Sequence, residues 1–167
     1  MLNNIKEKIG TILKSELFYS LLLVVFCVPA LYAHLPIRVD ITQQDSLEQK
    51  LWLTYSDLAK ETKYVLFQPP KTRFTQNPEI KYLKMIGCKE GEYLKTVNSE
   101  YYCEDRYLGT ALNVDMQGNL IGEHFIYNGI VPEHKLFVIG THKYSWDSKY
   151  FGFIDQKQIL RKAEPLL

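Results

Sequence analysis

The chain has 167 residues and a formal net charge of +1, with 20 basic and 19 acidic side chains. This length corresponds to one domain with an appendage, and a body of about 130 residues can bury a sizeable core. The nearly balanced charge argues against a nucleic-acid partner, which would require a basic face. The aromatic content of 13% favours sheets, because aromatic side chains cover a pleated, half-buried surface well.

The first predicted element is a membrane-spanning helix. Residues 17–35 carry no formally charged side chain, and their number falls within the roughly 17–25 residues that a helix needs to cross the hydrocarbon core. Three lysines precede this run, whereas the first cation after it is Arg38. The positive-inside rule therefore predicts a cytoplasmic N-terminus at 1–16, an anchor at 17–35 and an extracytoplasmic β-rich domain at 36–167. Small residues near the end of the run leave a cleaved signal peptide as the alternative.

The rest of the chain is predicted to form short strands. Aliphatic and aromatic runs follow one another at close spacing, with Gly, Pro or polar turns between them, and this pattern is typical of an all-β body. No strong amphipathic helix is predicted beyond the anchor. The run at 51–55 could also open a short helix, and residues 154–163 could form a strand or a helical turn. The strand candidates lie at 36–41, 51–55, 64–68, 80–86, 93–94, 101–103, 107–108, 112–114, 120–121 and 136–139.

The most specific pattern in the chain lies between Phe137 and Phe153. Its sequence, FVIGTHKYSWDSKYFGF, combines Gly, His, Ser, Asp and Lys with several aromatic residues. It resembles the last signature of bacterial type I signal peptidases, G-D-x-x-x-x-S-x-D-S-R-Y-W-G. The spacing before the first Ser is one residue shorter, which resembles the TraF-type peptidases of conjugative transfer. Thr141 stands where an Asp is usual.

The resemblance implies a role for three side chains of this segment. Ser145 would hydrogen-bond a base lysine and orient it, whereas Asp147 and Lys149 would pair and brace the loop. One alternative is that His142 serves as a base, since histidine titrates near neutral pH. Another is that the whole segment is an aromatic-rich surface turn.

The nucleophile candidate is Ser46. A serine needs a nearby base to attack a peptide at neutral pH. The sequence SLEQKLW resembles the family pattern S-L-P-x-G-L-Y, with Glu48 in place of Pro and Lys50 in place of Gly. By the same resemblance, the main-chain N–H of Ser46 and the side chain of Gln44 would hold the oxyanion. An exposed serine in a polar turn is the alternative reading, and Ser56 is the other nucleophile candidate.

The base candidate is Lys84. Burial can lower the pKa of a lysine toward neutrality and so make it a base. The run KMIGCKEGE resembles the family pattern K-R-V-x-[GC]-x-P-G-D, and its apolar neighbours can bury the lysine stem. The competitors are Lys81 and Lys89, and the alternative reading of Lys84 is a solvated lysine on an edge strand.

The cysteines of the body are Cys88 and Cys103, whereas Cys27 lies in the predicted anchor. The topology places the body in an oxidising compartment, where a Cys88–Cys103 disulfide is plausible. Two buried free thiols are the alternative.

Taken together, the motifs predict a mainly β protein: a signal-peptidase-like all-β catalytic domain behind one N-terminal transmembrane helix. The resemblance implies a serine endopeptidase with a Ser/Lys dyad, without metal or cofactor, in the bacterial inner membrane with its catalytic domain on the periplasmic side. Its expected partners are exported pre-proteins or pre-pilins, the lipid bilayer and the conjugative secretion machinery. A housekeeping signal peptidase is the alternative within the class. The alternative from another class is an inactive, membrane-tethered β-domain that acts as an assembly factor, because the Pro and Gly after the nucleophile are missing.

Overall fold

The computed structural model describes residues 2–42, 46–72, 75–77 and 79–166. The chain divides into two compact units, Met1–Pro36 and Ile37–Leu167. The first unit contains the helix α1, Leu2–Ala33, which ends slightly before the predicted end of the anchor. Its segment Ser15–Ala33 is apolar and long enough to cross a membrane, judged by length and composition.

The second unit is built mainly of strands, so the predicted mainly β fold is confirmed. In its described residues, seven strands form an antiparallel sheet in the order β1-β2-β11-β3-β4-β9-β10. The last strand in sequence, β11, thus lies between β2 and β3, and β2 separates it from β1. The bounds are β1 Ile37–Ile41, β2 Leu51–Tyr55, β3 Tyr64–Phe67, β4 Tyr82–Lys89, β9 Lys135–Ile139, β10 Ile154–Asp155 and β11 Ile159–Pro165.

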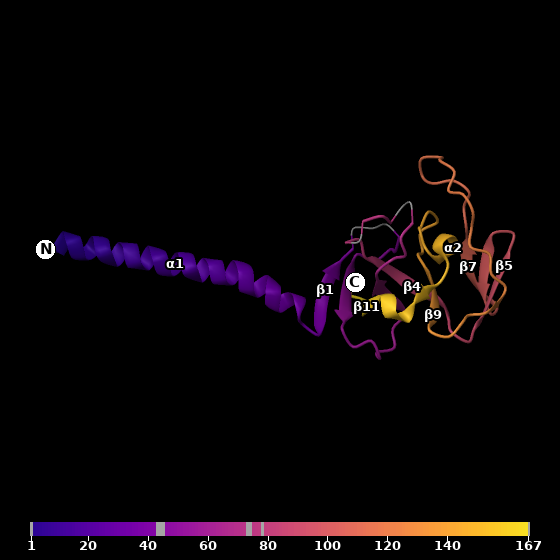
Figure 1. Ribbon diagram of the computed structural model, residues 1–167, viewed down its shortest axis with the longest axis horizontal. Helices are drawn as coiled ribbons and strands as arrows, with labels where there is room; N and C mark the ends of the chain where they lie inside the picture. Colours follow the sequence, from indigo (N-terminus) through magenta and orange to yellow (C-terminus); the bar gives the residue numbers. More distant parts are fainter. Residues whose placement is uncertain (1, 43–45, 73–74, 78, 167) are drawn as a thin grey trace. The chain divides into compact units, whose positions relative to one another are not determined.

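A smaller sheet of four strands, in the order β7-β6-β5-β8, completes the described body. Figure 1 shows β5 and β7 grouped at one end of the body and β1 at the other. The two sheets are cross-linked, because a disulfide joins Cys88 of β4 to Cys103 of β6. The bounds are β5 Tyr93–Val97, β6 Glu100–Cys103, β7 Arg106–Thr110 and β8 Gly129–Ile130.

Three local expectations differ from the structure or are resolved by it. Residues 51–55 form a strand with alternating burial, not the start of a helix. The candidates at 112–114 and 120–121 meet only through a single bridge between Val114 and Leu120. The C-terminal stretch contains both predicted alternatives, since the 3₁₀ turn Gln156–Gln158 separates β10 from β11.

The strand β4 lies inside the large sheet, between β3 and β9. Most of its residues are buried on both faces, as is typical of a strand covered on two sides. Ile86 on one face packs with Val65 and Val138, and Leu83 on the other packs with Leu47 and Trp52. A polar side chain on this strand therefore enters the protein interior, away from solvent.

Candidate active site

Lys84 is the polar side chain that β4 carries into the interior. It lies opposite Val65 of β3, and only 2% of it is exposed. Its Nζ atom donates a hydrogen bond to Ser145 Oγ at 2.8 Å. The competing lysines Lys81 and Lys89 are exposed. The reading of Lys84 as a solvated lysine on an edge strand is therefore wrong.

Burial changes the acidity of this lysine. Removal of the amine from water disfavours its charged form and lowers the pKa of Lys84 from 10.5 to about 8. The carboxylate of Asp147 acts in the opposite direction and the ammonium of Lys149 in the same direction as burial. The amine of Lys84 is thus available as a base at mildly alkaline pH.

The partner of Lys84 lies on the loop that connects β9 to the one-turn helix α2, Ser148–Phe151. This loop is fixed at both ends by hydrogen bonds. Ser145 N donates to His142 O, and Val138 N donates to the hydroxyl of Ser148. Ser145 itself is only 2% exposed. The hydroxyl that accepts from Lys84 is therefore held by the main chain around it, and the segment is not an exposed surface turn.

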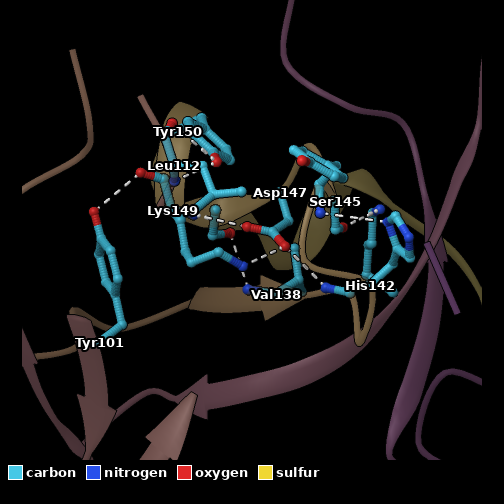
Figure 2. A network of polar contacts seen from close by, with 12 residues as sticks. Tyr101, Leu112, Val138, His142, Ser145, Asp147, Lys149 and Tyr150 are labelled. Atoms are coloured by element: carbon cyan, nitrogen blue, oxygen red, sulfur yellow. Dashed lines mark hydrogen bonds and ion pairs between the residues drawn. The ribbon is translucent and has the colours of Figure 1, made fainter. Parts of the chain in front are cut away.

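Asp147 is the centre of this loop, as Figure 2 shows. Its carboxylate accepts from Gly140 N at 2.9 Å and from the Nζ atom of Lys149 at 2.7 Å. It also caps α2 by accepting from Lys149 N. The exposed fractions of the two side chains are 0% for Asp147 and 3% for Lys149. Separating the two side chains would leave a buried charge without its counter-ion, which is energetically costly. The pair therefore holds the loop in the conformation that keeps Asp147 and Lys149 in contact.

Ser46 is held against the same loop by its main chain. Its carbonyl oxygen accepts hydrogen bonds from Thr141 N at 2.8 Å and His142 N at 3.3 Å. Gly140 lies where these parts meet: a Cβ atom there would be 2.6 Å from Ser46 O and would clash with the Ser145 side chain. The absence of a side chain at 140 thus lets the segments of Ser46 and Ser145 approach each other.

The predicted residues are brought together to different degrees. Lys84 with Ser145, and Asp147 with Lys149, are in direct contact. Within the described residues, the hydrogen bond of Lys84 goes to Ser145 and not to Ser46. Gln44, the predicted oxyanion donor, lies outside the described residues.

The remaining candidates lie in less suitable places. His142 meets Ser46 through its main-chain N–H, while its ring Nδ1 faces Tyr144 N at 3.3 Å. Ser56 is exposed beyond the end of β2. The sulfurs of Cys88 and Cys103 lie near the Glu92 carboxylate, but both are held in the disulfide and are not free to ligate a metal.

Sequence reasoning missed one supporting residue, Tyr101. Its side chain is fully buried on β6, and its single hydroxyl proton is shared between Phe125 O at 2.7 Å and Lys149 O at 3.0 Å. Burial raises the pKa of Tyr101, so the hydroxyl remains a donor. Figure 2 shows this tyrosine reaching the loop from the smaller sheet. No sequence pattern distinguishes it among 12 tyrosines, since its role depends on a contact over 48 positions.

Pocket size alone does not indicate this site. A hollow of about 920 Å³ is lined by Lys63, Lys89 and Arg106, among others, and includes neither Ser46 nor Lys84 in its walls. A smaller pocket of about 330 Å³ lies beside Ser46, between residues 47–50 and 141–143. The hydrogen-bonded groups, rather than the hollow volume, mark the candidate site.

Comparisons with known proteins indicate the family of this chain. The sequence model of the family described as signal peptidase, peptidase S26, matches residues 11–167. Signal peptidase I of Buchnera aphidicola subsp. Schizaphis graminum (strain Sg) is 27% identical across 76% of this chain and 39% of that protein. The chain thus spans about two fifths of the length of this relative.

A solved structure also resembles the chain. The crystal structure of a signal peptidase I from Enterococcus faecalis V583 matches 65% of this chain and 97% of that one, with 22% identity and a TM-score of 0.38. The family assignment rests on the sequence model, which covers nearly the whole chain. The chain therefore belongs to the signal peptidase family, peptidase S26.

Proposed function

We propose that this chain is a membrane-anchored serine endopeptidase that cleaves signal or leader peptides from exported proteins. Ser46 is its nucleophile and Lys84 its base. The observation that carries this proposal is the buried amine of Lys84, whose pKa is lowered to about 8 and which is hydrogen-bonded to Ser145. In a member of the signal peptidase family, a lysine with this environment is suited to activate a serine.

Acylation is the first half of the proposed reaction. Neutral Lys84 takes the proton from Ser46 Oγ, and the oxygen attacks the carbonyl carbon of the scissile peptide. The tetrahedral oxyanion is stabilised by the main-chain N–H of Ser46 and, in this proposal, by the Gln44 amide. Lys84 then returns its proton to the leaving amine, and an acyl-enzyme on Ser46 remains.

Deacylation follows with water as the nucleophile. Lys84 takes a proton from the water, the hydroxide attacks the ester carbon, and the proton passes to Ser46 Oγ as the ester bond breaks. Ser145 keeps the amine of Lys84 in place in both halves, because it accepts one of the three N–H bonds of the ammonium form.

The reaction requires Ser46 Oγ to reach Lys84, although the amine donates to Ser145 in this structure. Catalytic hydrogen bonds are often long or poorly aligned without substrate and tighten in the complex. The main-chain contacts of Ser46 with Thr141 and His142 keep the serine at the loop of Ser145. In this proposal, rotation of the Ser46 side chain on substrate binding brings its Oγ toward Lys84, and the main chain does not have to move.

Two finer parts of the proposal concern place and substrate. The lysines before the apolar segment support a body on the periplasmic side of the membrane. The short spacing between Gly140 and Ser145 supports the TraF-type branch, in which pre-pilins and the conjugative secretion machinery are the partners. Processing of a pre-pilin but not of a general secretory pre-protein would support this branch, and the reverse would favour a housekeeping peptidase.

The decisive experiment is processing of a co-expressed pre-protein by the full chain in membranes. Ser46→Ala and Lys84→Ala should each abolish the mature product on a gel. Ser56→Ala and Lys81→Ala are the matched controls, since both residues are exposed and of the same types. Unchanged processing by both Ser46→Ala and Lys84→Ala would contradict the assignment.

A second candidate function is a catalytically inactive, membrane-tethered assembly factor. It is favoured by the hydrogen bond of Lys84 to Ser145 rather than Ser46, and by the charged residues Glu48 and Lys50 after the serine. This candidate predicts that wild-type chain processes neither kind of pre-protein. It also predicts that Ser46→Ala complements a deletion of the gene as well as the wild type does.

A further inference from the structure

The pocket beside Ser46 has two short walls. One wall is the segment directly after the serine, and the other is the segment that follows Gly140. Its volume of about 330 Å³ is enough for one side chain, since a water molecule takes a share of about 30 Å³ in the liquid. The lining residues are Leu47, Glu48, Lys50, Thr141, His142 and Lys143.

Both walls are fixed relative to Ser46. Thr141 N and His142 N donate to Ser46 O, which ties the second wall to the serine. Leu47 is only 3% exposed and packs in a core cluster with Trp52, which anchors the first wall. An extended peptide advances about 3.3 Å per residue, so the pocket is within reach of substrate side chains a few positions from the scissile bond.

The charges of the lining are predominantly positive. Lys50 and Lys143 each bring a cation and Glu48 brings one anion, and Leu47 adds an apolar side chain to the lining. The Nζ atom of Lys143 lies 4.8 Å from the ring centroid of Tyr144, a contact that limits where this cation can go.

We propose that this pocket binds a carboxylate side chain, Asp or Glu, of the substrate within a few residues of the scissile bond. Lys50 and Lys143 are its specificity-determining residues. This inference rests on the proposed peptidase function, because it describes which peptides that function selects. Both lysines are exposed, so each should contribute the modest energy of a solvent-screened ion pair.

The test uses the full chain in detergent micelles and a set of synthetic peptides. A reference peptide with small neutral residues around the cleavage site is varied by placing Asp, Asn or Lys in turn at each of the four positions on either side. The pocket predicts one position at which Asp raises kcat/KM over Asn by about two- to five-fold and Lys lowers it. The preference should decrease as NaCl is raised, because the lysines are accessible to salt.

Charge reversal tests the residues themselves. The double variant Lys50→Glu/Lys143→Glu should prefer Lys over Asp at that same position. Lys95→Glu is the matched control, an exposed lysine on β5 of the smaller sheet, and it should keep the wild-type preference. If the double reversal impairs folding, Lys143→Gln should bring the ratio of Asp to Asn toward one.

The outcomes separate this inference from the proposed function. Cleavage of the reference peptide without any charge preference, or an unchanged preference in the reversed variants, overturns the inference and leaves the peptidase function standing. No cleavage of any peptide counts against the function. In that case the charge preference of the pocket is measured by fluorescence anisotropy with labelled Asp and Lys peptides. Equal affinities for the two peptides would overturn the inference.

Discussion

At the scale of single residues, the burial of Lys84 has the largest consequence for the chemistry of the candidate site. A lysine ordinarily keeps its ammonium group in water, and removing it from water favours the neutral amine. Burial is the largest influence on the pKa of Lys84. The Asp147 carboxylate opposes it and the Lys149 ammonium adds to it, and the pKa is lowered to about 8. Ser145 satisfies one of its hydrogen bonds without adding a formal charge.

The lowered pKa of Lys84 predicts how the rate of cleavage depends on pH. Below about pH 8 the amine of Lys84 is protonated and cannot accept the serine proton, so kcat/KM should fall about tenfold per pH unit. Above that value the neutral amine predominates and the rate should level off. The profile should be measured with a peptide that has no ionisable group near the cleavage site. A limb near pH 10.5 would mean a solvated lysine and would contradict the assignment of buried Lys84 as the base.

At the scale of elements, the segment from β9 to α2 carries the hydroxyl of Ser145 that accepts the hydrogen bond of Lys84. Asp147 caps α2, holds Gly140 N and pairs with Lys149 at 2.7 Å, so one side chain ties the end of a strand to the start of a helix. Because burying two charges costs desolvation energy, the main effect of this pair is to fix the conformation of the loop.

A double-mutant cycle can measure this coupling. Lys149→Met should lower the free energy of unfolding by about 3–5 kcal/mol, because it leaves the Asp147 carboxylate buried without its counter-ion. Asp147→Asn/Lys149→Met should lose less than the sum of the two single changes, by about 1 kcal/mol or more. Urea unfolding followed by circular dichroism gives these values.

The matched control for this cycle is the ion pair of Lys135 and Asp155, which is partly exposed. Lys135→Met should lower the free energy of unfolding much less than Lys149→Met does, because solvent screens the exposed pair. Equal losses for Lys149→Met and Lys135→Met would contradict a structural role of the buried pair.

At the scale of the whole molecule, the body is two sheets joined near the site. The disulfide starts at Cys88 on the strand that carries Lys84 and ends at Cys103 on the smaller sheet, which also supplies Tyr101 to the loop. Bonds of this kind persist in oxidising compartments, which agrees with the proposed periplasmic location.

Removing this cross-link should weaken the body measurably. Cys88→Ser/Cys103→Ser should lower the free energy of unfolding by about 3 kcal/mol, the value for a closed loop of about 15 residues. Dithiothreitol should destabilise the wild type to a similar extent and leave the double variant unchanged. Cys27→Ser in α1 is the control and should behave as the wild type. An insensitive wild type would show that the disulfide does not contribute.

The elements were predictable from sequence where the signal was local. The uncharged run at 17–35 and the run at 64–68 each predict an element that the structure contains, whereas the run at 51–55 left a strand and a short helix both open. The strand candidates at 112–114 and 120–121 were overestimated, because these described residues form one isolated bridge and no strand. Spacing alone does not reveal how far a ladder of hydrogen bonds extends.

Residue types at short spacing were enough to predict the family, the mainly β class and the residues that meet in the loop. Which lysine is buried and which partner it contacts depends instead on the folded arrangement of distant strands. Lys81, Lys84 and Lys89 lie close together in sequence, yet only Lys84 points into the sheet interior, opposite Val65 and against Ser145, 61 positions away. The acidity of the amine depends on its exclusion from water and on charges brought from distant segments. Both arise only when the chain has folded.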